Sequence, residues 1–158
     1  MRLQITCIGR PDRLFADAIG EYERRAARYW SLTTVEVKAE KAGKGRTDAQ
    51  VREAESRRLV EQVPPGFEVV ALTREGVAWS STRLARHLES LAVSARPGVA
   101  FLIGGALGID DGVIARANLR LSLSSLTLPH DLARLVLLEQ LYRAGTILRG
   151  EPYHKADE

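Results

Sequence analysis

The residues whose types and spacing could support chemistry lie in three segments of the last third of the chain. An apolar run ends at Gly104 and Gly105, the segment 121–128 alternates leucine with hydroxyl side chains, and residues 153–155 read Tyr-His-Lys. Glycine lets a ligand or a backbone approach closely because it has no Cβ atom. In open α/β sheets, ligands bind outside the carboxyl ends of the strands. The first two segments therefore predict one small-molecule pocket.

The segment 121–128 indicates what kind of ligand this pocket takes. It offers backbone amides and an apolar wall, which suit an adenine or a thioether-bearing ligand. The alternative interpretation is a buried strand whose Ser and Thr side chains cap the next helix. The 104–108 loop has neither the Gly-x-Gly-x-x-Gly spacing of a dinucleotide fold nor the Lys-Ser/Thr end of a P-loop, so we expect no nucleotide triphosphate site.

Metal chemistry and cysteine chemistry are not expected. The three histidines are far apart in sequence and lack zinc-ligand spacing. Asp110 and Asp111 precede a short apolar segment and are expected to stabilise a helix start. Cys7 is the only cysteine, and its alternation with Ile5 predicts a buried, inert strand thiol.

Two segments carry charge that could serve either structure or function. Glu139 and Arg143 are spaced i,i+4, which predicts an exposed helix pair worth about 0.3–0.5 kcal/mol. The net charge is +3, and basic residues cluster in the 38–46 segment and on the helix expected before it. Such a cluster suits a polyanion such as nucleic acid, or it is a solvated loop.

The elements that must position these residues alternate between strand and helix. Strands are expected at 3–9, 33–37 and 67–72 and after Gly98, with a turn at 73–76. Helices are expected after residue 12, from an N-cap at Asp48 to 63, after Ser80 or Ser81, and over 131–148. This alternation predicts an α/β fold with a parallel sheet covered on both faces. The last helix has more apolar surface than one sheet face needs, which indicates a subunit contact.

Length and composition predict one domain spanning residues 1–158. The chain is 45% hydrophobic and 27% charged, which is enough to build one core. The first apolar run meets Pro11 at once, so it is too short for a signal peptide or a membrane span. We therefore expect a cytoplasmic protein without membrane contact.

Four motifs in one order resemble a known family. They are Leu-Ile-Gly-Gly-x-x-Gly, Leu-Ser-x-Leu-Thr-Leu-Pro-His, Glu-Gln-Leu-Tyr-Arg-Ala and Pro-Tyr-His-Lys, and the similarity extends to the start of the chain. The chain resembles the ribosomal RNA large subunit methyltransferase H family of the SPOUT class. The resemblance implies an α/β fold with a deep carboxy-terminal trefoil knot, a homodimer, and S-adenosylmethionine-dependent N3-methylation of a pseudouridine in 23S ribosomal RNA. We separately expect the RNA within the assembled ribosome to be the substrate, because a dimer of so small a chain needs the particle to supply part of the recognition surface.

The resemblance also assigns roles to residues. Cofactor contacts fall at Leu72, Gly104, Gly105, Leu123, Ser124, Ser125, Leu126, Thr127 and Leu128. The general base is left open among His130, His154 and Glu139, although His130 after Pro129 is also a common structural position. Arg143 is expected to stabilise negative charge on the uracil or to hold a phosphate. Tyr153, His154 and Lys155 are expected to reach the substrate or the partner subunit's site.

Two other classes of function stay open. A non-catalytic RNA-binding factor of ribosome assembly would use the basic segment 38–46 and bind no cofactor. A small nucleotide-using oxidoreductase is disfavoured because the glycine fingerprint of such enzymes is absent.

Overall fold

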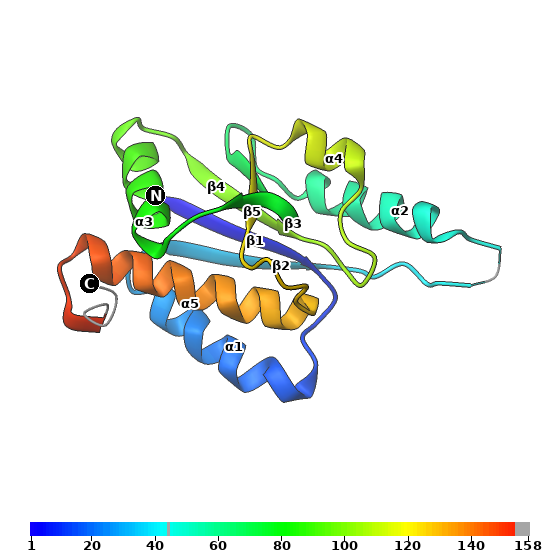
Figure 1. Ribbon diagram of the computed structural model, residues 1–158, viewed down its shortest axis with the longest axis horizontal. Helices are drawn as coiled ribbons and strands as arrows, with labels where there is room; N and C mark the ends of the chain where they lie inside the picture. The colour runs from blue at the N-terminus through cyan, green and yellow to red at the C-terminus, as the bar shows by residue number, and fades with distance from the viewer. Residues whose placement is uncertain (44, 154–158) are drawn as a thin grey trace.

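The computed structural model describes residues 1–43 and 45–153 and is built on one five-stranded sheet (Figure 1). Its strand order is β2-β1-β4-β3-β5, and every neighbouring pair is parallel. The strands are β1 (Arg2–Ile8), β2 (Ser31–Val37), β3 (Glu68–Ala78), β4 (Gly98–Ile103) and β5 (Leu119–Ser122). The helices are α1 (Arg13–Ala26), α2 (Asp48–Glu61), α3 (Ser81–Val93), α4 (Asp111–Arg116) and α5 (His130–Leu148).

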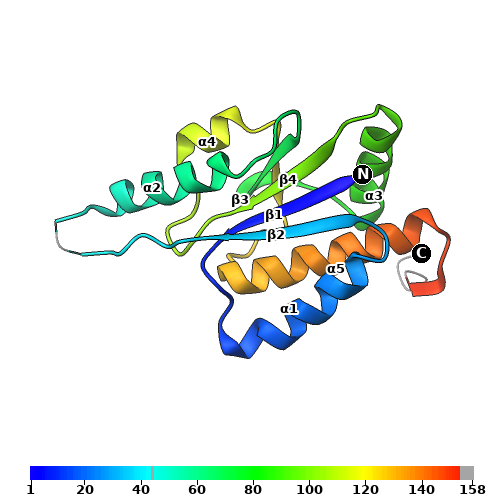
Figure 2. The same ribbon diagram turned by 180° about the vertical axis from the view of Figure 1, so that it is seen from behind.

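Helices cover both faces of the sheet, as Figures 1 and 2 show from opposite sides. Alternate strand residues point to opposite faces. Leu3 and Phe101 belong to the core beneath α1, α3 and α5, whereas Ile8 and Leu102 belong to a second core beneath α2 and α4. The predicted α/β class with a parallel sheet is confirmed.

Local capping fixes where several helices begin. Ser80 caps α3 and Asp110 caps α4, as two of the expected sites. The expectation for α2 was wrong by one residue. Thr47 is its N-cap and forms a capping box, in which the Gln50 backbone N–H donates to the Thr47 hydroxyl at 3.2 Å and the Thr47 N–H donates to the Gln50 side chain at 2.9 Å.

The third strand is longer than predicted, and the turn expected at 73–76 is wrong. β3 continues to Ala78, and its pairing with β5 shifts register between Leu72 and Val77. A bulge of this kind inserts residues into one strand and lets pairing resume afterwards. The polar sequence Thr-Arg-Glu-Gly resembles a turn, but here it forms a bulge of β3 beside β5.

One buried side chain connects the second half of the chain to the first, and another buried group is an inert thiol. Arg134 of α5 is buried, and its guanidinium donates to Glu23 of α1 and to Glu36 of β2, both at 3.0 Å. Cys7 is buried as predicted, and burial raises the pKa of its thiol to about 11. The thiol is therefore protonated at neutral pH and unreactive.

Two expectations concern the path of the chain and its relation to membranes. Strand order and pairing do not specify whether a chain passes through its own loop, so the trefoil knot stays a prediction. Within the described ranges 1–43 and 45–153, no helix combines the length and the apolar character needed to cross a membrane.

Candidate functional site

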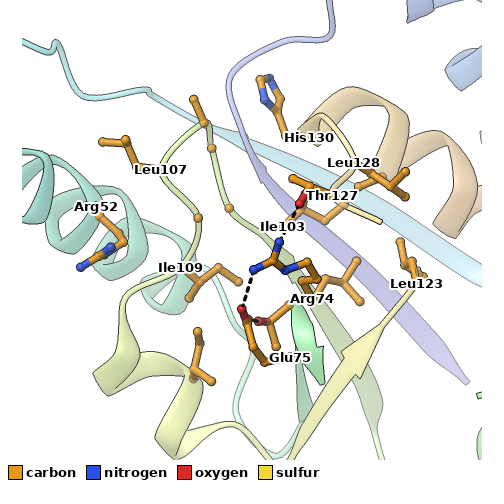
Figure 3. Close-up of a pocket in the computed structure, with 18 of the residues that line it drawn as sticks. Arg52, Arg74, Glu75, Ile103, Leu107, Ile109, Leu123, Thr127, Leu128 and His130 are labelled. Carbon is orange, nitrogen blue, oxygen red and sulfur yellow. Dashed lines mark hydrogen bonds and ion pairs between the residues drawn. The ribbon is translucent and has the colours of Figure 1, made fainter. Parts of the chain in front are cut away.

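A cavity of about 450 Å³ opens where β3, β4 and β5 present their carboxyl-side residues (Figure 3). We call it the strand-end cavity. The two segments singled out in the sequence meet there, as predicted. Among the expected cofactor contacts, those that line it are Leu72, Gly104, Gly105, Leu123, Ser124, Leu126, Thr127 and Leu128.

The loop after β4 folds tightly on itself, and this requires glycine. A Cβ atom added at Gly104 would lie 2.5 Å from the backbone carbon of Gly108. The Gly108 backbone N–H donates to the Gly105 carbonyl at 3.0 Å, and Gly108 has a φ of 79°, in the left-handed region. The loop is thus a compact turn whose backbone can approach a ligand closely.

Helix α2 holds this loop in place from behind. The Asp110 backbone N–H donates to the Ser56 hydroxyl at 2.8 Å. The Glu55 carboxylate accepts from the Glu40 backbone N–H at 3.1 Å, and its other oxygen would lie 2.8 Å from a Cβ atom at Gly105. The Ser56 contact and the close approach of Glu55 to Gly105 hold the loop against α2, which reduces the ordering that ligand binding requires.

The loop after β5 forms the opposite wall through serine turns. The Ser122 hydroxyl donates to the Ser124 carbonyl, and the Ser124 hydroxyl accepts from the Leu126 backbone N–H, both at 2.9 Å. Ser125 belongs to this loop but does not line the cavity. The side chain of Leu126 is unusually open to solvent, with 74% of its surface exposed. The interpretation of 121–128 as one buried strand is wrong, because β5 ends at Ser122 and the loop follows.

The bulge of β3 contributes charged residues that the sequence did not single out. The Arg74 guanidinium donates to the Thr127 hydroxyl at 3.1 Å and lies 3.4 Å from the Glu75 carboxylate (Figure 3). The Thr73 hydroxyl donates to Glu75 at 2.8 Å and, together with Arg74, holds the pKa of this carboxyl below its ordinary value. To predict from the sequence that these residues line the cavity, one would have to recognise the bulge, and nothing in the sequence of this segment indicates a bulge.

His130 is the predicted catalytic residue that lies at the cavity. It begins α5, lines the cavity wall and remains 40% exposed in its side chain. Its Nε2 atom lies 3.6 Å from the Asp131 carboxylate, which accepts from the Asp12 backbone N–H at 2.8 Å. An accessible imidazole in this position can accept a proton from a bound substrate.

Glu139, Arg143 and Tyr153 form a separate group, which we call the tail cluster. Arg143 Nε donates to Glu139 at 3.0 Å, the Tyr153 hydroxyl donates to the same oxygen at 3.1 Å, and the Arg143 guanidinium lies 5.0 Å from the Tyr153 ring centre. None of the three lines the strand-end cavity. The expectation of an exposed Glu139–Arg143 pair is wrong, since their side chains are only 21% and 20% exposed because Tyr153 packs over them.

The position of the tail cluster follows from the geometry of α5. Glu139 is nine residues beyond His130, which corresponds to about 13 Å along a helix. Arg143 is one further turn away. Two remaining expected site residues, His154 and Lys155, lie outside the described residues.

The strand-end cavity fits the cofactor that the resemblance implies. Its volume is in the range of small-molecule sites, about 300–1,000 Å³. Aliphatic side chains line it on both sides, including Leu72, Ile109 and Leu123, and the close turn at Gly104 exposes backbone rather than side chains. An adenosine with a thioether-like chain needs this combination of an apolar slot and main-chain hydrogen bonds.

Comparisons with known proteins show what the chain is similar to. A family model described as a predicted SPOUT methyltransferase matches residues 1–154. The chain is 53% identical over 156 residues to the ribosomal RNA large subunit methyltransferase H of Gemmatimonas aurantiaca, covering 98% of this chain and 100% of that protein. It is 43% identical over 159 residues to the protein of the same name in Listeria monocytogenes, with the same coverage.

Solved structures support the fold. A tRNA-modifying enzyme of the TrmH/SpoU type from A. aeolicus superposes with a TM-score of 0.54 at 13% identity, covering 94% of this chain and 77% of that one. A probable methylase family protein from Haemophilus influenzae gives a TM-score of 0.51 at 13% identity, covering 96% and 69%. At this identity the likeness concerns the arrangement of strands and helices alone.

Proposed function

The chain belongs to the ribosomal RNA large subunit methyltransferase H family of SPOUT methyltransferases, and we propose that it methylates N3 of a pseudouridine in 23S ribosomal RNA. The single observation that carries the proposal is the strand-end cavity, which gathers eight of the nine expected cofactor-binding residues. Family membership identifies it as an enzyme that uses S-adenosylmethionine, which disfavours both the oxidoreductase and the non-catalytic assembly factor.

The residues of the cavity would hold the cofactor in a defined pose. The 123–128 loop and Leu72 would contact its adenosine, and the 104–108 turn would pack against it through backbone atoms. When bound, S-adenosylmethionine supplies an electrophilic methyl group on a sulfonium. The protein must hold the nucleophilic nitrogen in line with that group and exclude water, since positioning alone can supply much of the rate.

The proposed reaction also needs a proton acceptor. Transfer of the methyl group from the sulfonium to N3 would leave a neutral thioether and would require the N3 proton to pass to a base. His130, His154 and Glu139 remain the candidates, and His130 is favoured within one subunit because it lines the cavity. The Arg143 guanidinium would stabilise negative charge on the uracil as the proton leaves.

We further propose that the enzyme is a homodimer in which the tail cluster of one subunit serves the cavity of the other. The cluster and His130 are separated by about 13 Å along α5, so one subunit does not bring them to one substrate atom. A two-fold related partner could present its own Tyr153, His154 and Lys155 beside the cavity, with an aromatic side chain available for base stacking.

The proposed substrate is ribosomal RNA within the ribosome, which would place the reaction in the cytoplasm. Residues 1–158 form one catalytic domain in this proposal, and the assembled particle would supply part of the recognition surface. Basic residues 38–46 would add contacts to phosphates.

The test is the transfer of radiolabelled methyl groups from S-adenosylmethionine to ribosomes of a strain lacking this gene. Free subunits, naked RNA and a short stem-loop serve as parallel substrates. We expect label in one pseudouridine of the large-subunit RNA, with ribosomes as the best substrate. Absence of label despite cofactor binding by calorimetry would refute the substrate, and efficient methylation of the stem-loop would refute the need for the particle.

A further inference from the structure

One charged side chain of the strand-end cavity has no protein partner. Arg52, from α2, lines the cavity wall, and its Nε atom is buried without a hydrogen-bond acceptor. Within residues 1–43 and 45–153 its guanidinium makes no hydrogen bond and no ion pair. Buried N–H groups without an acceptor are rare in native proteins, so an unfilled donor in a cavity wall points to a ligand.

The other arginine of the cavity is already engaged. Arg74 contacts Thr127 and Glu75, so its donors are directed within the protein. Figure 3 places Arg52 on the α2 side, across the 104–109 loop from Leu123 and Leu128. The unpaired cation thus lies at the end of the cavity opposite the loop that suits adenine.

An unpaired carboxylate lines the same cavity. Asp111 belongs to α4, which packs against α2, and its side chain has no hydrogen bond or ion pair among the described residues. The carboxylate next to it in sequence is different, because Asp110 is occupied as the α4 cap. One free cation and one free anion in a single cavity complement a zwitterion.

We propose that Arg52 binds the carboxylate of the methionine end of S-adenosylmethionine and that Asp111 faces its ammonium group. The inference rests on the proposed function, because it takes that cofactor as the ligand. The adenosine would lie against the 123–128 loop, and the amino-acid end would extend towards α2 and α4. Arg52 is then a binding residue that fixes the direction of the cofactor and hence of its methyl group.

An RNA phosphate is the competing ligand for Arg52. The buried Nε atom favours the carboxylate, because a backbone phosphate would approach from the surface. Exposed Lys38 and Lys41, whose side chains have no partner among the described residues, are available for phosphates there.

The test measures binding of three ligands by calorimetry to the full-length protein and its R52M variant. The ligands are S-adenosylmethionine, its decarboxylated form, and 5′-methylthioadenosine, which lacks the whole amino-acid end. We expect R52M to weaken S-adenosylmethionine on the order of tenfold or more and to leave the other two unchanged, because only the first carries the carboxylate. R57M is the matched control, since Arg57 lies on the same helix, pairs with Glu53 and does not line the cavity.

A second variant tests the other half of the proposal. We expect D111N to weaken S-adenosylmethionine and its decarboxylated form, which both carry the amine, and to spare methylthioadenosine. Equal affinities of wild type and R52M for S-adenosylmethionine, or equal weakening of all three ligands, would overturn the role of Arg52. If R52M weakens binding to ribosomes but not to S-adenosylmethionine, Arg52 would be assigned to a phosphate instead. A wild-type protein that binds none of the ligands would instead refute the proposed function.

Discussion

At the scale of residues, the site depends on a missing Cβ atom at Gly104 and on a donor of Arg52 that is unpaired within the described part of the chain. Gly104 lacks the Cβ atom that would collide with Gly108, and the buried Nε donor of Arg52 has no partner among residues 1–43 and 45–153. Both features leave room or hydrogen-bonding capacity for a ligand. The charged residues that are already satisfied, Arg74 and Glu75, instead connect the β3 bulge to the loop after β5.

The close turn at Gly104 leads to a specific prediction. G104A places a methyl group 2.5 Å from the Gly108 backbone, so the loop must open. Overpacking of this kind typically costs about 1–3 kcal/mol, so we expect affinity for S-adenosylmethionine to fall about tenfold or more. Calorimetric titration measures this change.

G20A is the matched control for G104A. Gly20 lies inside α1, and a Cβ atom there would meet nothing within 4 Å. Alanine favours the helix over glycine, so we expect unchanged binding and a gain of about 0.5–1 kcal/mol in the free energy of unfolding. Wild-type affinity in G104A would show that the turn does not shape the binding site.

At the scale of elements, the position of α5 determines the position of His130. The helix begins at His130 beside the cavity and crosses the sheet face, where Arg134 connects it to α1 and β2. The Trp30 indole N–H also donates to the Leu141 carbonyl at 2.8 Å. Apolar packing alone would let α5 slide along the sheet. These polar contacts between distant segments fix the position of α5 along its axis.

Removal of the Arg134 guanidinium should therefore destabilise the fold. In R134M, Glu23 and Glu36 lose their common partner, while their side chains remain 31% and 30% exposed to water. Because water can partly replace the lost contacts, we expect a loss of about 2 kcal/mol rather than the full cost of breaking a buried pair. Urea unfolding at neutral pH measures the free energy.

The two carboxylates provide the control for this prediction. If their unpaired charge causes the loss, replacing Glu23 and Glu36 by glutamine in the R134M background should recover part of the stability. The account would be contradicted if the triple variant loses as much free energy of unfolding as R134M and the two glutamine substitutions lose when added together. The effect would then be assigned to packing of the Arg134 side chain.

At the scale of the whole molecule, one parallel sheet brings three distant strand ends together and leaves the tail cluster elsewhere. β3 and β4 are separated by α3, and β4 and β5 by α4, but β4-β3-β5 are neighbours in the sheet. The strand-end cavity therefore forms within one subunit. In the proposed homodimer, the catalytic residues of the tail cluster would come from the second subunit.

The dimer proposal predicts complementation between two inactive subunits. G104A and R143M subunits are co-expressed with two different tags, and their heterodimer is purified. In this heterodimer the R143M subunit keeps an intact cavity turn, and the G104A subunit supplies an intact Arg143 to it. We expect about half of the wild-type methyl-transfer activity from it, because one of the two symmetric sites is complete.

Each variant homodimer is the control for this experiment and, at an S-adenosylmethionine concentration far below the Kd of the G104A cavity, should be nearly inactive while keeping its mass in sedimentation. A heterodimer as inactive as the homodimers would place Arg143 and the cavity in the same subunit's site. A monomeric wild-type protein would reject the dimer itself.

The sequence by itself determined the class of fold, the cavity walls and the family. Periodic apolar residues predicted alternating strands and helices, because burial of one face imposes a local period. Gly104, Gly105 and the 123–128 segment were recognisable because their chemistry is unusual for ordinary loops. Local signals of this kind need no knowledge of distant residues.

Only the tertiary structure decided which charged residues meet. Arg52 and Asp111 line the cavity, and Arg134 is buried between Glu23 and Glu36, but nothing near them in sequence indicates this. The β3 bulge and the partial burial of Glu139 beside Tyr153 were missed for the same reason. Burial and pairing of a charge depend on segments that are far apart in the chain, and these are brought together only by packing of the whole molecule.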